Sequence, residues 1–268
     1  MSAYEAVILD VDGTLVRGER VLPGAVDGLR AIDDTGCQRL LFSNNPTRGG
    51  DHYAERLGKH DISVDPEFVL TSASVSVGYL SATHPDDSIY LVGEDRLREL
   101  LEAASLEVTD DPASAGVVLG SIDRALTYDQ LSASLGALEV ADAFYGTDPD
   151  VTIPTENGFQ PGSGAIIAAM EAIAGWKVDA ILGKPSSIAA ATALQRLETA
   201  PERTLIVGDR PDTDIELGAR AGMDTALVTT GVTSSEQAAT GELSVEPDYV
   251  LESLAELEAV LTGNDRDK

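Results

Sequence analysis

The sequence contains one cysteine, Cys37, among its 268 residues, which excludes an internal disulfide bond. Cys37 precedes an apolar, strand-like run, so we expect a structural thiol rather than a reactive one. No apolar run approaches the ~20 residues that a membrane-spanning helix needs. The segment MSAYEAVILDVDG also lacks the basic and apolar regions of a secretory signal. We therefore expect a soluble, cytoplasmic protein.

Basic residues are scarce: 18 Lys and Arg stand against 46 Asp and Glu, for a net charge of −28. This charge repels nucleic acids and anionic membranes, so we expect neither as a partner. The lysines are Lys59, Lys177, Lys184 and Lys268. Because salt screens repulsion between surface acids, we predict a halophilic source rather than an ordinary acidic protein. The melting temperature should then rise from dilute buffer to molar KCl, and a fall would contradict the prediction.

Apolar runs alternate with amphipathic segments along the chain, which is typical of parallel βαβ construction. At the two ends of the chain, strands are predicted at 6–12, 39–45, 204–209 and 225–231, and helices at 23–36 and 253–261. The middle has a pattern of its own, with strands at 88–94, 116–122 and 143–148 and helices at 96–104, 128–140 and 162–175. We therefore predict an α/β protein with a core formed by 1–78 and 179–268 and an inserted α/β domain at 79–178.

Two acidic residues, Asp10 and Asp12, lie at the carboxyl end of the first predicted strand, in the segment DVDGT. Ligands of open parallel sheets bind beyond the carboxyl ends of the strands. Two neighbouring carboxylates repel one another unless a cation lies between them, and Gly13 permits a tight turn with exposed amides. The pattern favours a functional site, although a solvated acidic turn is the alternative.

Polar residues also end three later segments. Ser43, Asn44 and Asn45 end a buried strand and can donate hydrogen bonds to a phosphoryl group, although such residues are also common in turns. Lys184 lies between the apolar, strand-like run DAIL and a predicted helix. Its ammonium group there can neutralise a carboxylate and a phosphate; the alternative is a surface lysine.

The last of these segments, GDRPDTD, follows the run TLIV and supplies Asp209 as an oxygen ligand suited to Mg²⁺. Asp214 is either an additional ligand or an acid that supports the ligands from outside. We interpret Asp212, in the same segment, as a solvated or capping acid.

Taken in this order, DVDGTL, FSNN, GKP and GDRPDTD resemble the four motifs of the haloacid dehalogenase (HAD) superfamily. The insert between the second and third motifs resembles the C2-capped branch. The segments YLVGEDRLREL, GTDPD, PGSGAIIAAMEA and ILGKPS are similar to its NagD-like, or p-nitrophenylphosphatase-like, subgroup. Two departures are Ser43, where many relatives have Thr, and NNPTR in place of NNS. The resemblance implies a Rossmann-like parallel-sheet core with a cap domain of the C2 type.

The resemblance also implies a role for each matching residue. Asp10 would be the nucleophile of a phosphatase, and Asp12 the general acid and base. Mg²⁺ would be held by Asp10, the backbone carbonyl of Asp12, Asp209 and Asp214. Ser43, Asn44, Asn45 and Lys184 would bind the phosphoryl group. The substrate would be a small phosphate ester, and a homodimer is the oligomer that such caps suggest.

The segment 147–154 corresponds to the loop that selects substrates in these relatives, and includes Asp148, Asp150 and Ile153. The aliphatic Ile153 offers no charge or stacking surface, which favours a small ester or relaxed specificity; a plain cap turn is the alternative. Three other functions stay open. They are a phosphotransferase or mutase on the same scaffold, a phospho-accepting signalling module, and a binding protein with little activity.

Overall fold

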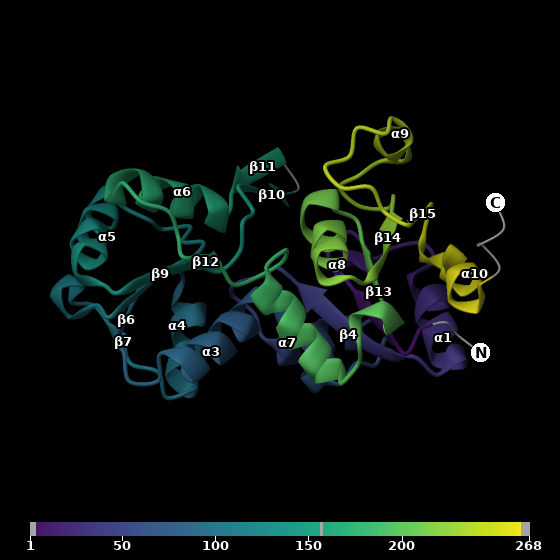
Figure 1. Ribbon diagram of the computed structural model, residues 1–268, viewed down its shortest axis with the longest axis horizontal. Coiled ribbons are helices and arrows are strands. Elements are labelled where there is room, and N and C mark those ends of the chain that lie inside the picture. The colour runs from purple at the N-terminus through teal and green to yellow at the C-terminus, as the bar shows by residue number, and fades with distance from the viewer. Residues whose placement is uncertain (1–3, 156–157, 264–268) are drawn as a thin grey trace. The chain divides into compact units, whose positions relative to one another are not determined.

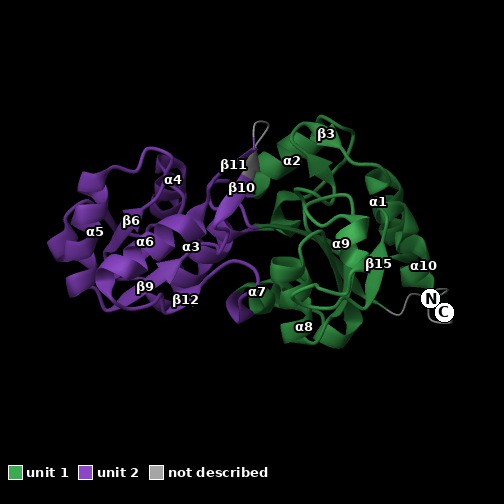
Figure 2. Ribbon diagram, turned by 90° about the horizontal axis from the view of Figure 1, so that it is seen from above, with its two compact units in different colours: residues 1–43, 50–70, 189–268 green, residues 44–49, 71–188 purple. Residues whose placement is uncertain are grey.

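The computed structural model describes residues 4–155 and 158–263 (Figure 1). Its two larger β-sheets, of six and five strands, have helices packed on them, and two smaller sheets are two-stranded hairpins. The chain divides into two compact units (Figure 2). The first comprises residues 1–43, 50–70 and 189–268, and the second residues 44–49 and 71–188. The second unit extends beyond the predicted insert at both ends. The insert boundaries of 79 and 178 stay a prediction.

The first sheet has six strands in the order β15-β14-β13-β1-β4-β5. Their bounds are Ala6–Leu9 (β1), Gln38–Ser43 (β4), Val69–Thr71 (β5), Thr204–Gly208 (β13), Asp224–Val228 (β14) and Tyr249–Leu251 (β15). β1 lies parallel to both β4 and β13, and β14 lies parallel to β13 and β15. Every residue of β1 and β13 is buried, as expected of parallel strands that are covered on both faces.

One face of this sheet packs against α1 (Ala25–Thr35) and α10 (Leu257–Thr262). Alternate residues of β1, Val7 and Leu9, join this core, because successive side chains of a strand point to opposite faces. On the other face, Gly218 of α8 (Glu216–Ala221) approaches β13 so closely that a Cβ there would lie 2.4 Å from Ile206 Cγ2. Helices thus cover both faces, and the strand ends are left as the place for a site.

The chain leaves β1 in one direction across the sheet, to β4, and β13 lies on the opposite side of β1. Such a reversal of strand order parts the loops that follow the strands and opens a crevice at their carboxyl ends. Leu9 is level with Val207 of β13 and with Leu41 of β4. Asp10, Asp209 and Ser43 are therefore brought to one edge of the sheet.

The second sheet has the order β12-β9-β8-β6-β7, and its neighbouring strands are parallel. Its strands are Ile89–Val92 (β6), Val108–Thr109 (β7), Val117–Gly120 (β8), Ala143–Gly146 (β9) and Ala180–Ile181 (β12). Helices α4 (Asp95–Ala103), α5 (Tyr128–Val140) and α6 (Ser163–Ala174) accompany it. The predicted strands and helices of the middle segment are confirmed to within a few residues. Trp176 packs edge-on against Phe144, with ring centroids 5.7 Å apart.

Several elements were not predicted. Among them are the hairpin of β2 (Val16–Arg17) and β3 (Arg20–Val21), the hairpin of β10 (Thr152–Thr155) and β11 (Gly158–Pro161), and helices α2 (Gly50–Gly58), α3 (Ser72–Thr83) and α9 (Ser235–Ala239). Helix α7 (Ser187–Leu197), in contrast, lies after Lys184, where a helix was predicted. Helix α3 is rich in Ser, Val and Thr, which are weak helix formers. Composition alone therefore does not predict this helix. A capping box between Thr71 and Ser74 stabilises its start.

Predicted strands 6–12, 39–45 and 225–231 run too far at their carboxyl ends, because β1, β4 and β14 stop at Leu9, Ser43 and Val228. The backbone turns there and presents polar groups instead of continuing the sheet. The predicted helix 253–261 begins as a 3₁₀ turn at Leu254–Glu256 before α10.

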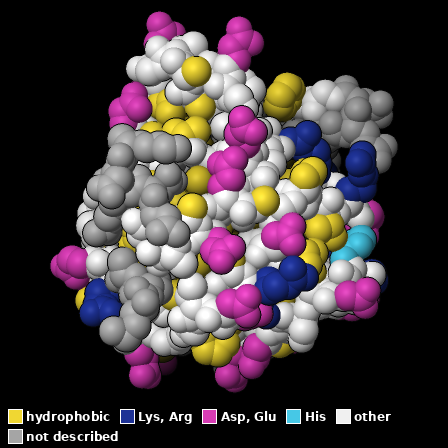
Figure 3. Space-filling model, turned by 90° about the vertical axis from the view of Figure 1, so that its right-hand side faces the viewer, with side chains coloured by type: hydrophobic (Ala, Val, Ile, Leu, Met, Phe, Trp, Pro, Cys, Tyr) yellow, Lys and Arg dark blue, Asp and Glu magenta, His cyan; other side chains and the backbone are white. Residues whose placement is uncertain are grey.

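Acidic side chains are dispersed over the face drawn in Figure 3, and fewer basic ones lie among them. The predicted rise of the melting temperature with KCl concentration stays a prediction. Cys37 is buried and its thiol lies 3.2 Å from the carbonyl oxygen of Tyr4, as expected of a structural thiol. Among the described helices, none has the length and apolar content needed to cross a membrane.

Candidate active site

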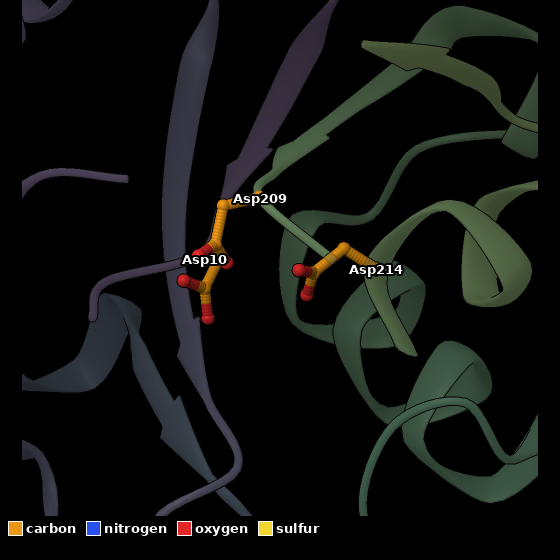
Figure 4. A group of neighbouring side chains, drawn as sticks. All are labelled: Asp10, Asp209 and Asp214. Carbon is orange, nitrogen blue, oxygen red and sulfur yellow. The ribbon is translucent and has the colours of Figure 1, made fainter. Parts of the chain in front are cut away.

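Three aspartates of the first unit form a buried cluster at the carboxyl edge of its sheet (Figure 4). Asp10 follows β1, Asp209 follows β13, and Asp214 lies in the π-helical turn Pro211–Ile215. One carboxylate oxygen from each lies within 4.8 Å of the others. Buried carboxylates this close repel one another unless a cation compensates their charge. Three hard oxygen donors in this arrangement fit a divalent metal ion.

Two glycines form the walls around Asp209. A Cβ at Gly13 would lie 2.1 Å from Asp209 Oδ2, and one at Gly231 would lie 1.8 Å from the same atom. Gly13 also has a backbone φ angle of 107°, which residues other than glycine rarely adopt. The amide of Val232 donates to Asp209 Oδ2 at 2.6 Å. The turn after β14 therefore fixes the rotamer of Asp209 by contact and by hydrogen bonding.

The turn around Gly231 is itself held by the hairpin of β2 and β3. Arg17 donates to the carbonyl oxygens of Thr230 and Gly231 at 2.6 and 3.0 Å. The hydroxyl of Thr230 donates to the carbonyl oxygen of Gly13 at 2.9 Å. These contacts join the loops that follow β1 and β14.

Asp214 reaches the cluster because the chain turns tightly after β13. A Cβ at Gly208 would lie 2.3 Å from Asp214 Cβ, and the amide of Arg210 donates to Asp214 Oδ2 at 3.2 Å. Asp212 points elsewhere and forms a two-point ion pair with Arg210, at 3.1 and 2.8 Å. Partial burial opposes its charged form, but Arg210 outweighs that effect and holds the pKa of Asp212 below its usual value. Of the two expected roles, a solvated or a capping acid, the structure supports the first, because Asp212 is exposed and paired with Arg210.

The carboxylate of Asp12 lies outside this cluster. Its Oδ1 accepts hydrogen bonds from both terminal nitrogens of Arg56, each at 3.0 Å. Its Oδ2 accepts from the hydroxyl of Tyr53 at 3.4 Å, and that hydroxyl lies 2.8 Å from Ser43 Oγ. The predicted metal contact through the Asp12 backbone carbonyl stays a prediction.

Sequence reasoning missed Tyr53 and Arg56. The available signal was their spacing: residues i and i+3 of a helix share a face, and α2 follows shortly after the polar end of β4.

The remaining predicted phosphate-binding residues belong to the second unit. The Asn44 side chain is paired with the backbone of Lys184: its amide donates to the Lys184 carbonyl at 3.0 Å, and its Oδ1 accepts from the Lys184 amide at 2.8 Å. Lys184 is buried, which is rare for a lysine and argues against the surface alternative. Asn45 Oδ1 accepts from the amide and hydroxyl of Thr47, at 2.9 and 3.0 Å.

The predicted loop 147–154 is only partly a loop, because its second half is strand β10. Ile153 lies in that strand, level with Gln160 of β11. Asp148 is 2 % exposed. It accepts hydrogen bonds from the Thr147 hydroxyl at 3.0 Å and from the Asp150 amide at 3.3 Å. Asp148 is therefore buried at the base of the hairpin, and its part in substrate selection stays a prediction.

Comparison with known proteins identifies the family. A family model described as haloacid dehalogenase-like hydrolase matches residues 7–107, and a second HAD-hydrolase-like model matches residues 181–257. An acid sugar phosphatase of Staphylococcus epidermidis is 34 % identical over 262 residues, which cover 96 % of this chain and 100 % of that protein. The chain belongs to the haloacid dehalogenase-like hydrolases.

Two further relatives bear on the subgroup of this HAD-like hydrolase. A 5′-nucleotidase of Bacillus subtilis is 33 % identical over 256 residues, covering 96 % of this chain and 98 % of that protein. The structure of a p-nitrophenyl phosphatase from Archaeoglobus fulgidus superposes with a TM-score of 0.91 at 29 % identity, covering 96 % and 99 % of the two chains. The predicted α/β fold, the NagD-like resemblance and the phosphatase class are confirmed. Because these enzymes match this chain over nearly its whole length, the comparison disfavours a phospho-accepting signalling module.

Asp148 gives this HAD-like hydrolase a pH-sensitive stability. Burial, together with the charge of Asp150, raises the pKa of Asp148 to about 7. A carboxyl with a higher pKa in the folded protein holds its proton more tightly there. The contribution of Asp148 to the free energy of unfolding should therefore fall as the pH rises from about 4, the pKa of an unperturbed aspartate, to about 7.

Asp148→Asn replaces this carboxyl by a neutral group of the same size. We expect the variant to unfold with the same free energy as the parent near pH 4. Near pH 8 it should be more stable, by up to about 4 kcal/mol. Urea unfolding at fixed KCl concentration between pH 4.5 and 8.5 measures the difference. Asp86→Asn, at an exposed position of the same unit, is the control. Curves of the same slope for Asp148→Asn and the parent would contradict the raised pKa.

Proposed function

We propose that the protein is a Mg²⁺-dependent phosphatase that hydrolyses small phosphate monoesters through an aspartyl-phosphate on Asp10. The observation that carries this proposal is the buried cluster of Asp10, Asp209 and Asp214 at the strand ends. The phosphatase relatives, which match nearly the whole chain, support the same class.

Asp10, Asp209, Asp214 and the backbone carbonyl of Asp12 would hold the metal ion. Their donor chemistry favours Mg²⁺ over softer metals, because all of the ligands are oxygens. The bound ion would supply charge neutralisation that lets an anionic nucleophile and an anionic phosphate approach one another.

The chain's own residues supply two displacements. A carboxylate oxygen of Asp10 attacks phosphorus, and the bond from phosphorus to the ester oxygen breaks while Asp12 gives that oxygen a proton. Asp12 then takes a proton from water, whose oxygen attacks phosphorus and breaks the bond to Asp10. The products are the alcohol and inorganic phosphate, and both aspartates return to their starting states.

Phosphoryl binding is proposed for Ser43, Asn44, Asn45 and Lys184, which match the second and third motifs of the family. A hydroxyl and amides orient the phosphoryl oxygens, and an ammonium group offsets their charge. The pairing of Asn44 with the Lys184 backbone supports a shared role for these two residues.

The relatives suggest a broad class of substrates and no single one. The relatives are named for different substrates, a sugar phosphate, a nucleotide and p-nitrophenyl phosphate. Asp150 and Ile153 lie at the β10–β11 hairpin, with Asp148 buried at its base. Since Ile153 brings neither charge nor an aromatic ring, we propose a small phosphate ester or relaxed specificity. A cytoplasmic location and a homodimer are proposed from sequence alone.

A phosphate-release screen tests the function. Sugar phosphates, nucleotides, phosphoglycolate and pyridoxal phosphate are incubated with the protein in high KCl, with Mg²⁺ or with a chelator. We expect Mg²⁺-dependent release of free phosphate from several small esters. Transfer of the phosphoryl group to a sugar in place of water would support the phosphotransferase alternative. The same screen on Ile153→His tests the hairpin, and an unchanged profile would remove Ile153 from specificity.

A further inference from the structure

Helix α2 carries two side chains that contact Asp12, and one of them, Tyr53, also contacts Ser43. Arg56 donates twice to Asp12 Oδ1, and the Tyr53 hydroxyl lies between Asp12 Oδ2 and Ser43 Oγ. Arg56 also donates to the carbonyl oxygen of Gly18, at the turn between β2 and β3. All of these residues belong to the first unit.

Tyr53 and Arg56 are far more buried than the Asp12 side chain that they contact. The Tyr53 side chain is fully buried, and the Arg56 side chain is 13 % exposed. The guanidinium group of Arg56 lies 5.9 Å from the centre of the Tyr53 ring, within the range of a cation–π contact. The Asp12 side chain, in contrast, is 48 % exposed. A half-exposed aspartate would sample several rotamers, and the Arg56 fork and the Tyr53 hydroxyl restrict it from two directions.

A general acid works only when its carboxyl group is within hydrogen-bond reach of the leaving oxygen. Small displacements of a catalytic group are costly to the rate. A group that restricts Asp12 therefore affects proton transfer without touching the reacting atoms. Ser43 is a proposed phosphoryl ligand. The Tyr53 hydroxyl, which contacts both Ser43 and Asp12, therefore relates the position of the proton donor to that of the phosphoryl group.

We propose that Arg56 and Tyr53 are positioning residues that fix the Asp12 carboxylate relative to Ser43 for protonation of the leaving group. This inference rests on the proposed role of Asp12 as general acid. Arg56 carries the larger share, because its two hydrogen bonds are shorter than that of Tyr53.

The test compares two substrates that differ in their need for a proton. p-Nitrophenolate leaves without protonation, whereas an alkoxide does not, so first-turnover release of the leaving group is measured for p-nitrophenyl phosphate and for glycerol phosphate. For Arg56→Met we expect roughly 10- to 100-fold slower release of glycerol and a change within about 3-fold for p-nitrophenolate. Tyr53→Phe should shift the ratio in the same direction by a smaller factor, and Arg56→Lys should recover part of the loss.

Two controls separate positioning from stability. Tyr4→Phe removes another tyrosine hydroxyl of the first unit, one that donates to Asp224 at 2.6 Å. Tyr4 lies just before the amino end of β1, whereas the aspartate cluster lies at the carboxyl ends of the strands. This substitution should leave the ratio of the two rates unchanged. In an Asp12→Asn background, Arg56→Met should add no further selective loss, because effects through a shared group are not additive.

The outcomes are distinguishable. If Asp12→Asn slows both substrates equally, the proposed role of Asp12 as general acid is wrong. If Asp12→Asn slows glycerol release selectively but neither Arg56→Met nor Tyr53→Phe does so, only the positioning role is overturned. Should Arg56→Met fail to fold, Tyr53→Phe and Arg56→Lys carry the same comparison.

Discussion

Asp10→Asn is expected to lower phosphatase turnover by roughly 10⁴-fold or more and to abolish trapping of an aspartyl-phosphate. An amide nitrogen or oxygen is a far weaker nucleophile than a carboxylate, while the side chain keeps its size. The substitution also removes one negative charge from three crowded, buried carboxylates. We therefore expect the metal-free variant to melt at the temperature of the parent or above it.

Two measurements check this result: steady-state phosphate release with Mg²⁺, and acid-quenched trapping of labelled phosphate on the protein. Asp27→Asn is the matched control, since Asp27 is an exposed acid on α1 that pairs with Arg30 at 3.4 Å. Turnover close to that of the parent would refute the assignment of Asp10 as nucleophile. Loss of turnover with phosphate still bound to Asp10→Asn would move the covalent step to another residue.

Gly231→Ala should reduce turnover by about 100-fold without unfolding the protein, since a displacement of about 1 Å at a catalytic group has costs of that size. The new Cβ would lie 1.8 Å from Asp209 Oδ2, so either the carboxylate or the turn must move. If the carboxylate moves, Asp209 leaves its place beside Asp10 and Asp214. If the turn moves, the hydrogen bond from the Val232 amide that holds Asp209 is displaced. The affinity for the divalent ion should fall together with turnover.

Calorimetric titration with Mg²⁺ and phosphate-release assays measure these two effects. Gly78→Ala is the control, because Gly78 lies inside α3 and a Cβ there meets nothing within 4 Å. It should keep both activity and metal affinity and should stabilise the helix by about 0.5–1 kcal/mol. Parent-like metal affinity in Gly231→Ala would show that the turn accommodates the methyl group and that Gly231 does not position Asp209.

Much of the first-unit site could be predicted from the chain itself. Buried runs that end in acids, at Asp10 and Asp209, mark strand ends in a parallel sheet, and such ends share one edge. The structure confirms that these two residues and Asp214 come together. The departure of Asp12 from the cluster could not be predicted, because its direction depends on Arg56, which lies 44 residues further along the chain.

The second unit shows the limits more clearly. The segment 147–154 was expected to be a loop, yet Ile153 lies in a hairpin strand. Asp148 of the same segment is buried, which its sequence context does not reveal. The hydrogen-bonding partner of Thr152–Thr155 is β11, and nothing in the alternation of these few residues reveals it. Burial of a short polar segment depends on its neighbours in space, which local patterns do not record.

By itself, the sequence determined the α/β class, the family and the chemical type of the site. These depend on local periodicity and on residue types at strand ends, which follow from backbone geometry. The tertiary structure decided which carboxylates meet, which glycines enclose them, and that Tyr53 and Arg56 of α2 hold Asp12. Such contacts join residues that lie far apart in the chain, and they form only because the packing of helices on the sheet fixes side-chain directions.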